Sequence, residues 1–243
     1  MNDAVRTVRT RGTPGAAATD AAPLGEPPLL LGGIVKSWTA SGPPVLRGAD
    51  LAVEGGTAVA ISGANGAGKT TLLRIAAGLI APEAGSVRVC GLDPERDRTA
   101  FHRRIGFLSA GNSGLYARLK AEEHLQLWAR LALMPRRARG PAIERALDAF
   151  GLREICGRRV DRLSMGQRQR LRMALTFLHG PSVVLLDEPA TSLDESGIAL
   201  IGRALDDLRE RGGAAVVCVP TGWGRMLPVD RDLVLADGLL GDA

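Results

Sequence analysis

The sequence is poor in aromatic residues, which make up 3% of its 243 positions, and its only lysines are Lys36, Lys69 and Lys120. With 45% hydrophobic residues, its core must be built mainly from aliphatic side chains. The arginines behind the net charge of +5 are scattered, and no aromatics interleave with them to form the stacking platform that single-stranded nucleic acid uses. We therefore expect an ordinary solvated surface and no nucleic-acid partner.

Cysteines and long apolar runs are also scarce. Cys90, Cys156 and Cys218 lie far apart without metal-ligand spacing, so we expect small apolar core residues in a reducing cytosol. No apolar run approaches the roughly 18 residues of a membrane span, and the N-terminus lacks the apolar segment of a signal peptide. Any role at a membrane would then be that of a peripheral subunit.

The order of apolar patterns predicts the fold class. Residues 1–27, rich in Ala, Thr, Pro and Gly, predict a disordered tail before one domain at residues 28–243. Strands are predicted from an alternating pattern between residues 29 and 53 and from apolar runs at 58–61, 85–91, 105–109, 183–186, 214–219 and 233–235. Helical spacing runs from residue 121 to about 178, with Pro135 and Pro141 separating its first helices, and again over 198–208. Strands alternating with helices predict an α/β fold with a mainly parallel sheet, a small antiparallel β region and an inserted helical subdomain at about 110–180.

Residues 63–70, GANGAGKT, carry the strongest chemical signal. They match the phosphate-binding pattern G-x-x-x-x-G-K-[ST] in full, after an apolar run at 58–61 and before a helical pattern that extends to Leu79. The glycines would let backbone N–H groups approach phosphate oxygens, while Lys69 would reach the β- and γ-phosphates and the Thr70 hydroxyl would bind Mg²⁺. The alternative is a glycine-rich turn that happens to carry a lysine. The predicted nucleotide-binding residues of this stretch are Gly63, Asn65, Gly66, Ala67, Gly68, Lys69, Thr70 and Thr71.

Two acidic residues end the apolar run at 183–186. A buried strand would deliver Asp187 and Glu188 to the carboxyl edge of the sheet, where ligands of open α/β folds bind. Asp187 would hold Mg²⁺ together with Thr70, and Glu188 would act as the general base for an attacking water. The alternative is that the two acids only cap the next helix.

The stretch Leu163-Ser164-Met165-Gly166-Gln167 resembles the LSGGQ signature of ATP-binding cassette (ABC) ATPases, with Met165 in place of the first glycine. The resemblance extends over residues 29–237 in the family's order, and Ser192-Leu193-Asp194 stands where the family has its D-loop. It implies a P-loop NTPase (RecA-like) core that dimerises head to tail around ATP.

In that dimer the signature of one subunit would face the nucleotide on the other. Ser164, Gly166, Gln167 and Asp194 would then contact the partner's ATP, and Ser164 would also cap its helix. Trp38 falls where such cassettes stack an aromatic ring on adenine, although a partly buried tryptophan at a strand end is the rival interpretation.

Two departures from the family pattern concern hydrolysis. The stretch Ser109-Ala110-Gly111-Asn112 lacks the family's Gln, and Pro220-Thr221-Gly222 replaces the segment that carries its His. None of His102, His124 and His179 falls at that position. Turnover would therefore be slow unless Asn112, Thr221 or a complete partner cassette compensates.

The resemblance implies the ATP-hydrolysing subunit of an exporter, at the cytoplasmic face of the cell membrane. Its partners would be a separate transmembrane permease and a second cassette, either the same chain or a different one. The alternatives are a soluble ATP-dependent switch that acts on nucleic acid or ribosomes, and a hydrolysis-impaired regulatory cassette. The transport and regulatory interpretations share the same predicted nucleotide-binding residues, and both imply ATP and Mg²⁺ as cofactors.

Overall fold

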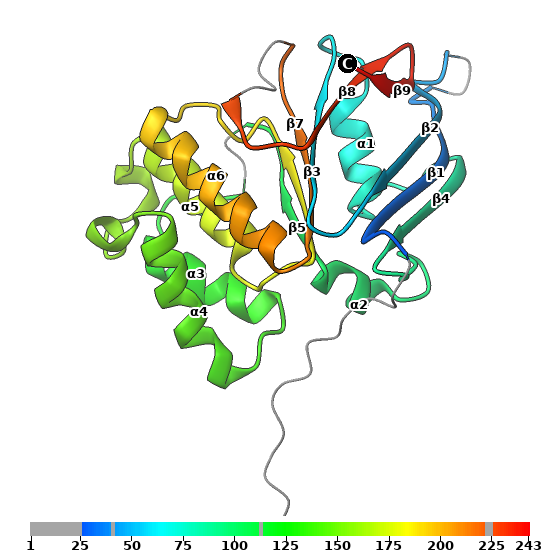
Figure 1. Ribbon diagram of the computed structural model, residues 1–243. Coiled ribbons are helices and arrows are strands. Elements are labelled where there is room, and N and C mark those ends of the chain that lie inside the picture. Colours follow the sequence, from blue (N-terminus) through cyan, green and yellow to red (C-terminus); the bar gives the residue numbers. More distant parts are fainter. Residues whose placement is uncertain (1–25, 40–41, 112–113, 222–225) are drawn as a thin grey trace, which may run out of the picture.

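The computed structural model describes residues 26–39, 42–111, 114–221 and 226–243. Two sheets enclose one helix, α1 (Lys69–Ala76), while further helices cover the opposite face of the larger sheet and extend into a lobe (Figure 1). The predicted tail at 1–27 lies, apart from residues 26 and 27, outside the described residues. No helix in the described ranges is long and apolar enough to span a bilayer.

The larger sheet has the strand order β5-β6-β7-β3-β8-β9. Its first five strands pair in parallel, and β9 runs antiparallel to β8. Its strands are β3 (Ala58–Ser62), β5 (Ile105–Leu108), β6 (Val183–Asp187), β7 (Ala214–Cys218), β8 (Arg231–Ala236) and β9 (Leu239–Asp242). This order places β3 between β7 and β8, in the middle of the sheet, with β6 one strand beyond β7.

Alternate residues of β3 point to opposite faces of the sheet, as the two-residue period of a strand requires. Ala58 and Ala60 belong to a core shared with the helices α5 (Met165–Phe177) and α6 (Glu195–Glu210). Val59 and Ile61 belong to a core shared with α1 and the smaller sheet. Both faces of β3 are therefore buried, which explains why its sequence reads as a continuous apolar run.

The smaller sheet is antiparallel, with the order β2-β1-β4. It consists of β1 (Leu29–Lys36), β2 (Leu46–Val53) and β4 (Ala84–Val89). Its buried face packs with α1 (Lys69–Ala76) in one apolar core. A mainly parallel sheet with a small antiparallel β region confirms the predicted fold class.

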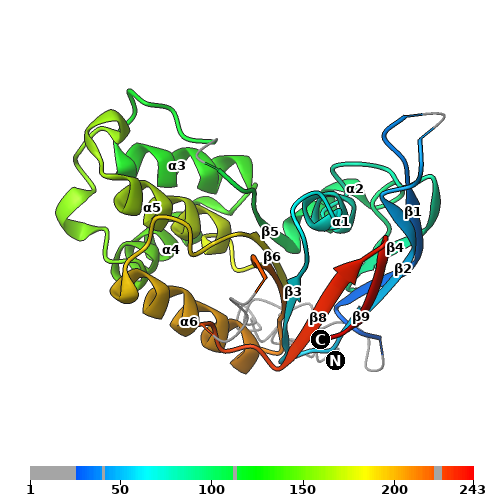
Figure 2. The same cartoon turned by 90° about the horizontal axis from the view of Figure 1, so that it is seen from above.

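The helical lobe lies on the side of the larger sheet away from β1, β2 and β4 (Figure 2). The helices on this side are α3 (Ala121–Leu131), α4 (Arg136–Ala149), α5 (Met165–Phe177) and α6 (Glu195–Glu210). The prediction that Pro141 separates two helices is wrong, because this proline lies inside α4. Proline there removes only one backbone hydrogen bond on an exposed face, while Ala142, Ala146 and Leu147 keep the other face buried. The predicted limits of this subdomain, about 110–180, stay a prediction.

Other boundaries also differ from the predictions. Leu79 does not continue α1, because Gly78 adopts a left-handed φ of 66° and the N–H of Leu79 turns back to the Arg74 carbonyl at 2.9 Å. This arrangement is a Schellman motif, which ends helices at glycine. The short helix α2 (Arg98–Arg103) and the strand β9 were not predicted from the sequence. Each is only four to six residues long, which is too short for a periodic pattern to stand out.

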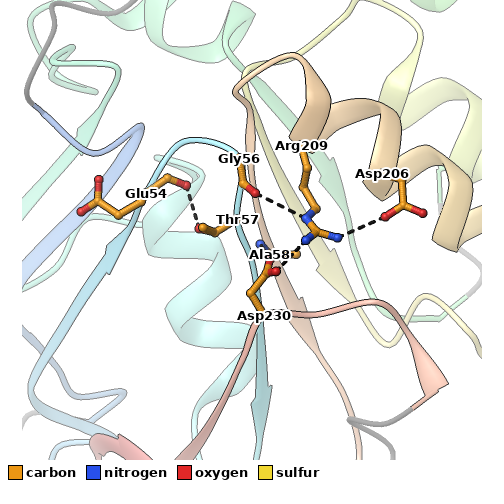
Figure 3. A network of polar contacts seen from close by, with 7 residues as sticks. All are labelled: Glu54, Gly56, Thr57, Ala58, Asp206, Arg209 and Asp230. Carbon is orange, nitrogen blue, oxygen red and sulfur yellow. Dashed lines mark hydrogen bonds and ion pairs between the residues drawn. The ribbon is translucent and has the colours of Figure 1, made fainter.

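The entry into β3 is fixed by a polar network at the end of the larger sheet where β3 begins (Figure 3). The Asp230 carboxylate accepts a hydrogen bond from the Ala58 N–H at 2.8 Å through one oxygen and from Arg209 Nη2 at 2.6 Å through the other. Arg209, in the last turn of α6, also contacts Asp206 and the Gly56 carbonyl. The strand that leads into the phosphate-binding pattern is thus tied to both β8 and α6.

Candidate nucleotide-binding site

The loop after β3 takes a path that only glycine can follow at two points. A Cβ on Gly63, which has a φ of 149°, would lie 2.5 Å from the Leu235 carbonyl oxygen. One on Gly68, with a φ of 107°, would lie 3.1 Å from a methyl carbon of Val45. The loop therefore passes close to β8 and to the start of β2 before α1 begins at Lys69. Its backbone N–H groups and the first turn of α1 form the kind of concave surface that binds phosphate.

Lys69 curls back over this loop. Its side chain is buried, with 7% of the residue exposed, and Nζ donates to the Gly63 carbonyl at 2.6 Å and to the Ala64 carbonyl at 3.1 Å. An ammonium has three donors and no acceptor, so the group can exchange these carbonyls for phosphate oxygens without moving far. That Lys69 reaches the β- and γ-phosphates stays a prediction.

Thr70 and Asp187 meet although 117 residues separate them in the chain. The Thr70 hydroxyl donates to Asp187 Oδ2 at 2.7 Å, and only 2% of Asp187 is exposed at the carboxyl end of β6. A hydroxyl and a carboxylate are the oxygen ligands that Mg²⁺ accepts alongside nucleotide phosphates, so these residues fit the metal. Within the described ranges there is no cluster of three or more His, Cys, Asp or Glu side chains that could hold a metal ion.

Glu188 follows directly in an unusual backbone conformation. Its φ of 50° is left-handed, and its N–H donates to the Cys218 carbonyl on β7 at 2.9 Å. Its side chain is half-buried. Residues held in this region of φ and ψ cluster at functional sites, where the surroundings impose the strain. The neighbouring Cys218 is a buried thiol whose pKa is raised, first by burial and then by the Asp187 carboxylate.

The signature stretch opens α5. Ser164 caps this helix by accepting the Gln167 N–H at 3.2 Å, and the Gln167 side chain accepts the Ser164 N–H at 3.0 Å. The predicted helix cap is therefore present. A Cβ on Gly166 would come within 3.1 Å of the Ser192 carbonyl, so this glycine lets the start of α5 approach the loop before α6.

Asp194 caps α6 within the same chain. Its Oδ1 accepts from the Gly197 N–H and the Ser196 hydroxyl, both at 2.8 Å, and these bonds hold the pKa of Asp194 below its usual value. Arg170 of α5 also reaches Oδ1, at 3.2 Å. The carboxylate therefore links the signature helix to α6, and its contact with a partner's nucleotide stays a prediction.

Trp38 follows β1 and is 60% exposed, which leaves one face of its ring open to a ligand; its stacking on adenine stays a prediction. Lys36 Nζ lies 6.0 Å from the centre of its ring. A hollow of about 500 Å³ beside the loop after β3 is lined by residues 63–67, by Val45 and its neighbours at the start of β2, by the β8–β9 turn and by Thr221. The structure thus brings Thr221, one of the two possible substitutes for the missing His and Gln, to the edge of the candidate site. Asn112, the other, lies outside the described residues.

A polar pair that the sequence reading overlooked lies on the buried face of α5. Gln169 and Arg172 are only 4% and 6% exposed, and their side chains contact each other at 2.8 Å. The available signal was their spacing of three residues, on the same face of the helix as Met173 and Thr176.

Comparisons with known proteins agree with this geometry. Residues 46–191 match the family model described as ABC transporter. The chain is 41% identical over 149 residues to the ABC transporter ATP-binding protein NatA of Bacillus subtilis, an alignment that covers 61% of this chain and 61% of NatA. It is 38% identical over 178 residues to the cytochrome c biogenesis ATP-binding export protein CcmA of Bordetella bronchiseptica, covering 73% of this chain and 78% of CcmA. The chain thus spans less than two thirds of NatA, and the names of its relatives include both import and export proteins.

A solved structure gives the same fold. The ATP-binding cassette MJ0796, as a dimer in a post-hydrolysis state bound to ADP and Pi, matches with a TM-score of 0.77 and 25% identity, over 88% of this chain and 98% of that one. The family match covers more than half of the 243 residues. The chain therefore belongs to the ABC transporter family, and its fold is that of the family's ATP-binding cassettes.

Proposed function

We propose that this chain is the ATP-binding and hydrolysing subunit of an ABC transporter and that it dimerises around MgATP to drive a separate permease. The observation that carries the proposal is the 2.7 Å contact between Thr70 and Asp187. It joins the phosphate-binding loop to the acidic end of β6, which is the arrangement that a nucleotide with its metal requires.

Each residue of the site has a chemical task in this proposal. The loop N–H groups and Lys69 bind and orient the phosphates, while Thr70 and Asp187 would hold Mg²⁺. When bound, the metal ion neutralises negative charge on the phosphate oxygens. Glu188 takes a proton from the attacking water, and the exposed ring of Trp38 stacks on the base.

The second cassette would supply the opposite side of each nucleotide. Ser164, Gly166 and Gln167 stand at the start of α5, where the first-turn N–H groups that the Ser164 side chain leaves free would donate to an anion. The dimer of MJ0796 with ADP and Pi bound supports dimerisation for a cassette of the same fold. A homodimer is the simplest form, because this chain has both the loop and the signature.

A groove of about 400 Å³ between the lobe and the larger sheet is a candidate site for the permease. It is lined by residues of α2, β5, α3 and α5, and at its rim Leu131 and Leu133 are 63% and 59% exposed. An apolar rim of this kind fits a short amphipathic segment of a membrane partner. The chain would then lie peripherally on the cytoplasmic face of the membrane, and we propose export, as in the name of CcmA.

Nucleotide binding is tested by Lys69→Ala in calorimetric titrations with MgATP, MgADP and AMP. Loss of the charge-assisted contacts should weaken MgATP binding by roughly 10- to 150-fold, about 1.5–3 kcal/mol. AMP lacks the β- and γ-phosphates and should bind the variant and the wild type equally. Equal MgATP affinities for the two proteins would remove the assignment of the loop.

Dimerisation is tested by Glu188→Gln in sedimentation runs with and without MgATP. The amide cannot act as a base, so the variant should accumulate as an ATP-bound dimer while the wild type returns to monomer after turnover. A double variant, Lys69→Ala with Glu188→Gln, is the control and should stay monomeric. A Glu188→Gln protein that binds ATP but remains monomeric at every concentration contradicts the sandwich model.

The second candidate is a hydrolysis-impaired ATP-binding switch that takes no part in transport. The observation that favours it is the absence of the family's Gln from residues 109–112 and of its His from the segment that begins at Pro220. The two candidates differ in membrane association: the transport subunit should co-purify with a polytopic permease from membranes, whereas the switch should not.

A further inference from the structure

Arg172 stands out because its charge is buried without a carboxylate. Only 6% of the residue is exposed, and no ion pair with Asp or Glu is formed by it among the described residues. Burial lowers the pKa of its guanidinium, yet an arginine keeps its proton. A buried charge of this kind is costly unless several acceptors surround it.

The acceptors come from the loop after β5 and from α5 itself. Arg172 Nη2 donates to the Ser109 carbonyl at 2.5 Å and to the Ser109 hydroxyl at 3.3 Å, and Nη1 donates to the Gly111 carbonyl. These two carbonyls flank Ala110, within the stretch of residues 109–112 that lacks the family's Gln. The guanidinium therefore clamps the backbone of this loop from both sides.

A second contact extends the clamp toward Glu188. Arg172 Nη1 donates to Gln169 Oε1 at 2.8 Å, and Gln169 Nε2 donates to the Pro189 carbonyl at 2.8 Å. Because arginine can only donate, it fixes the orientation of the Gln169 amide, with the oxygen toward Arg172 and the nitrogen toward Pro189. Pro189 directly follows Glu188, whose left-handed backbone needs outside support.

We propose that Arg172 is a positioning residue that fixes the loop after β5 and the Glu188 turn in one register relative to α5. This inference rests on the proposed function. In the proposed cycle, a movement of the helical lobe would carry both segments together, because the same guanidinium holds the loop directly and the turn through Gln169. Arg172 would hold the loop that lacks Gln in place of that side chain. Through Gln169 it would also keep Glu188 in position beside the nucleotide.

A matched control lies one turn earlier on the same helix. Arg168 donates to the Val160 carbonyl at 3.0 Å and to the Asp161 carbonyl at 3.2 Å, so it also anchors α5 to backbone, but within the lobe. Removing either arginine should lower stability. Only the removal of Arg172 should change the backbone and the ATPase rate at the candidate site.

The experiment compares Arg172→Met, Arg172→Lys and Arg168→Met with the wild type. Hydrogen exchange of the nucleotide-free proteins is followed in peptides covering residues 105–111 and 183–191, and kcat and KM for ATP are measured separately. Arg172→Met should speed exchange in both segments and lower kcat by about 10- to 100-fold, with KM changed by less than about threefold. Arg172→Lys, which still donates but cannot span two carbonyls, should fall between. Arg168→Met should leave exchange in both segments and kcat at the wild-type values.

The inference is overturned if Arg172→Met and Arg168→Met give the same exchange in residues 183–191 and the same kcat. If Arg172→Met does not fold, Gln169→Glu takes its place: it keeps the contact with Arg172 and loses the donation to Pro189, so only residues 183–191 should exchange faster. A wild-type protein that binds no ATP would instead refute the proposed function, and the exchange comparison would still decide whether the two segments are linked.

Discussion

Removing the Asp230 carboxylate should loosen the strand that leads into the phosphate-binding loop. In Asp230→Ala the Ala58 N–H, at a fully buried residue, loses its 2.8 Å acceptor. An orphaned buried donor costs about 1–3 kcal/mol. The ion pair between Asp230 and Arg209 is also lost. Because the side chains of Arg209 and Asp230 are 27% and 33% exposed, solvent screens this pair, and its loss adds only about 0.2–1 kcal/mol. We therefore expect a loss of about 2–3 kcal/mol, or a fall in Tm of roughly 4–12 °C for a chain of this size.

The companion variant Asp230→Asn separates the two contributions. Its amide oxygen can still accept the Ala58 N–H, whereas its NH₂ group cannot pair with Arg209. Its loss should be about 1 kcal/mol or less, which is the value of the exposed ion pair alone. Both variants would be unfolded in urea with circular dichroism as the signal, and an unchanged m-value would show that the same surface is exposed on unfolding. If the two variants agree within about 0.5 kcal/mol, the bond to Ala58 contributes nothing and the reasoning is wrong.

Two further predictions concern turnover and pH. The wild-type ATPase should be slow, and Thr221→His should raise its kcat, because one preorganised donor near the transferring phosphate is worth about 100- to 1000-fold in rate. The prediction is contradicted if the wild type turns over many times per second and Thr221→Ala is equally fast. His124 is buried, and burial lowers its pKa while its Nε2 accepts the Tyr116 N–H at 2.8 Å. The folded protein therefore favours neutral His124, the unfolded chain binds the proton first, and stability should be lost as the pH falls below about 6.5. The pKa values of His102 and His179 are also lowered, so a variant is needed to isolate the contribution of His124. The free energy of unfolding in urea should fall less steeply between pH 7 and 5.5 for His124→Gln than for the wild type.

The sequence by itself determined those features that depend on neighbours along the chain. The loop at 63–70 could be recognised because its glycines, lysine and threonine act together within one turn, between a strand and a helix that carry their own periods. The alternation of strands and helices determined the parallel sheet, since a parallel pair needs a crossover between its strands. The Ser164 cap was equally local.

Only the tertiary structure decided which distant residues meet. Asp187 reaches Thr70 because the strand order places β6 only one strand away from β3, whose loop leads into Thr70. No local pattern in the sequence records that strand order. Pro141 continues a helix because the buried face of α4 outweighs one missing hydrogen bond, a balance that depends on what the helix packs against. Arg172 looked like one more solvated arginine until the fold placed two loop carbonyls over it. Whether a charge is solvated or buried is decided by the partners that folding brings together, and those partners lie far away in the sequence.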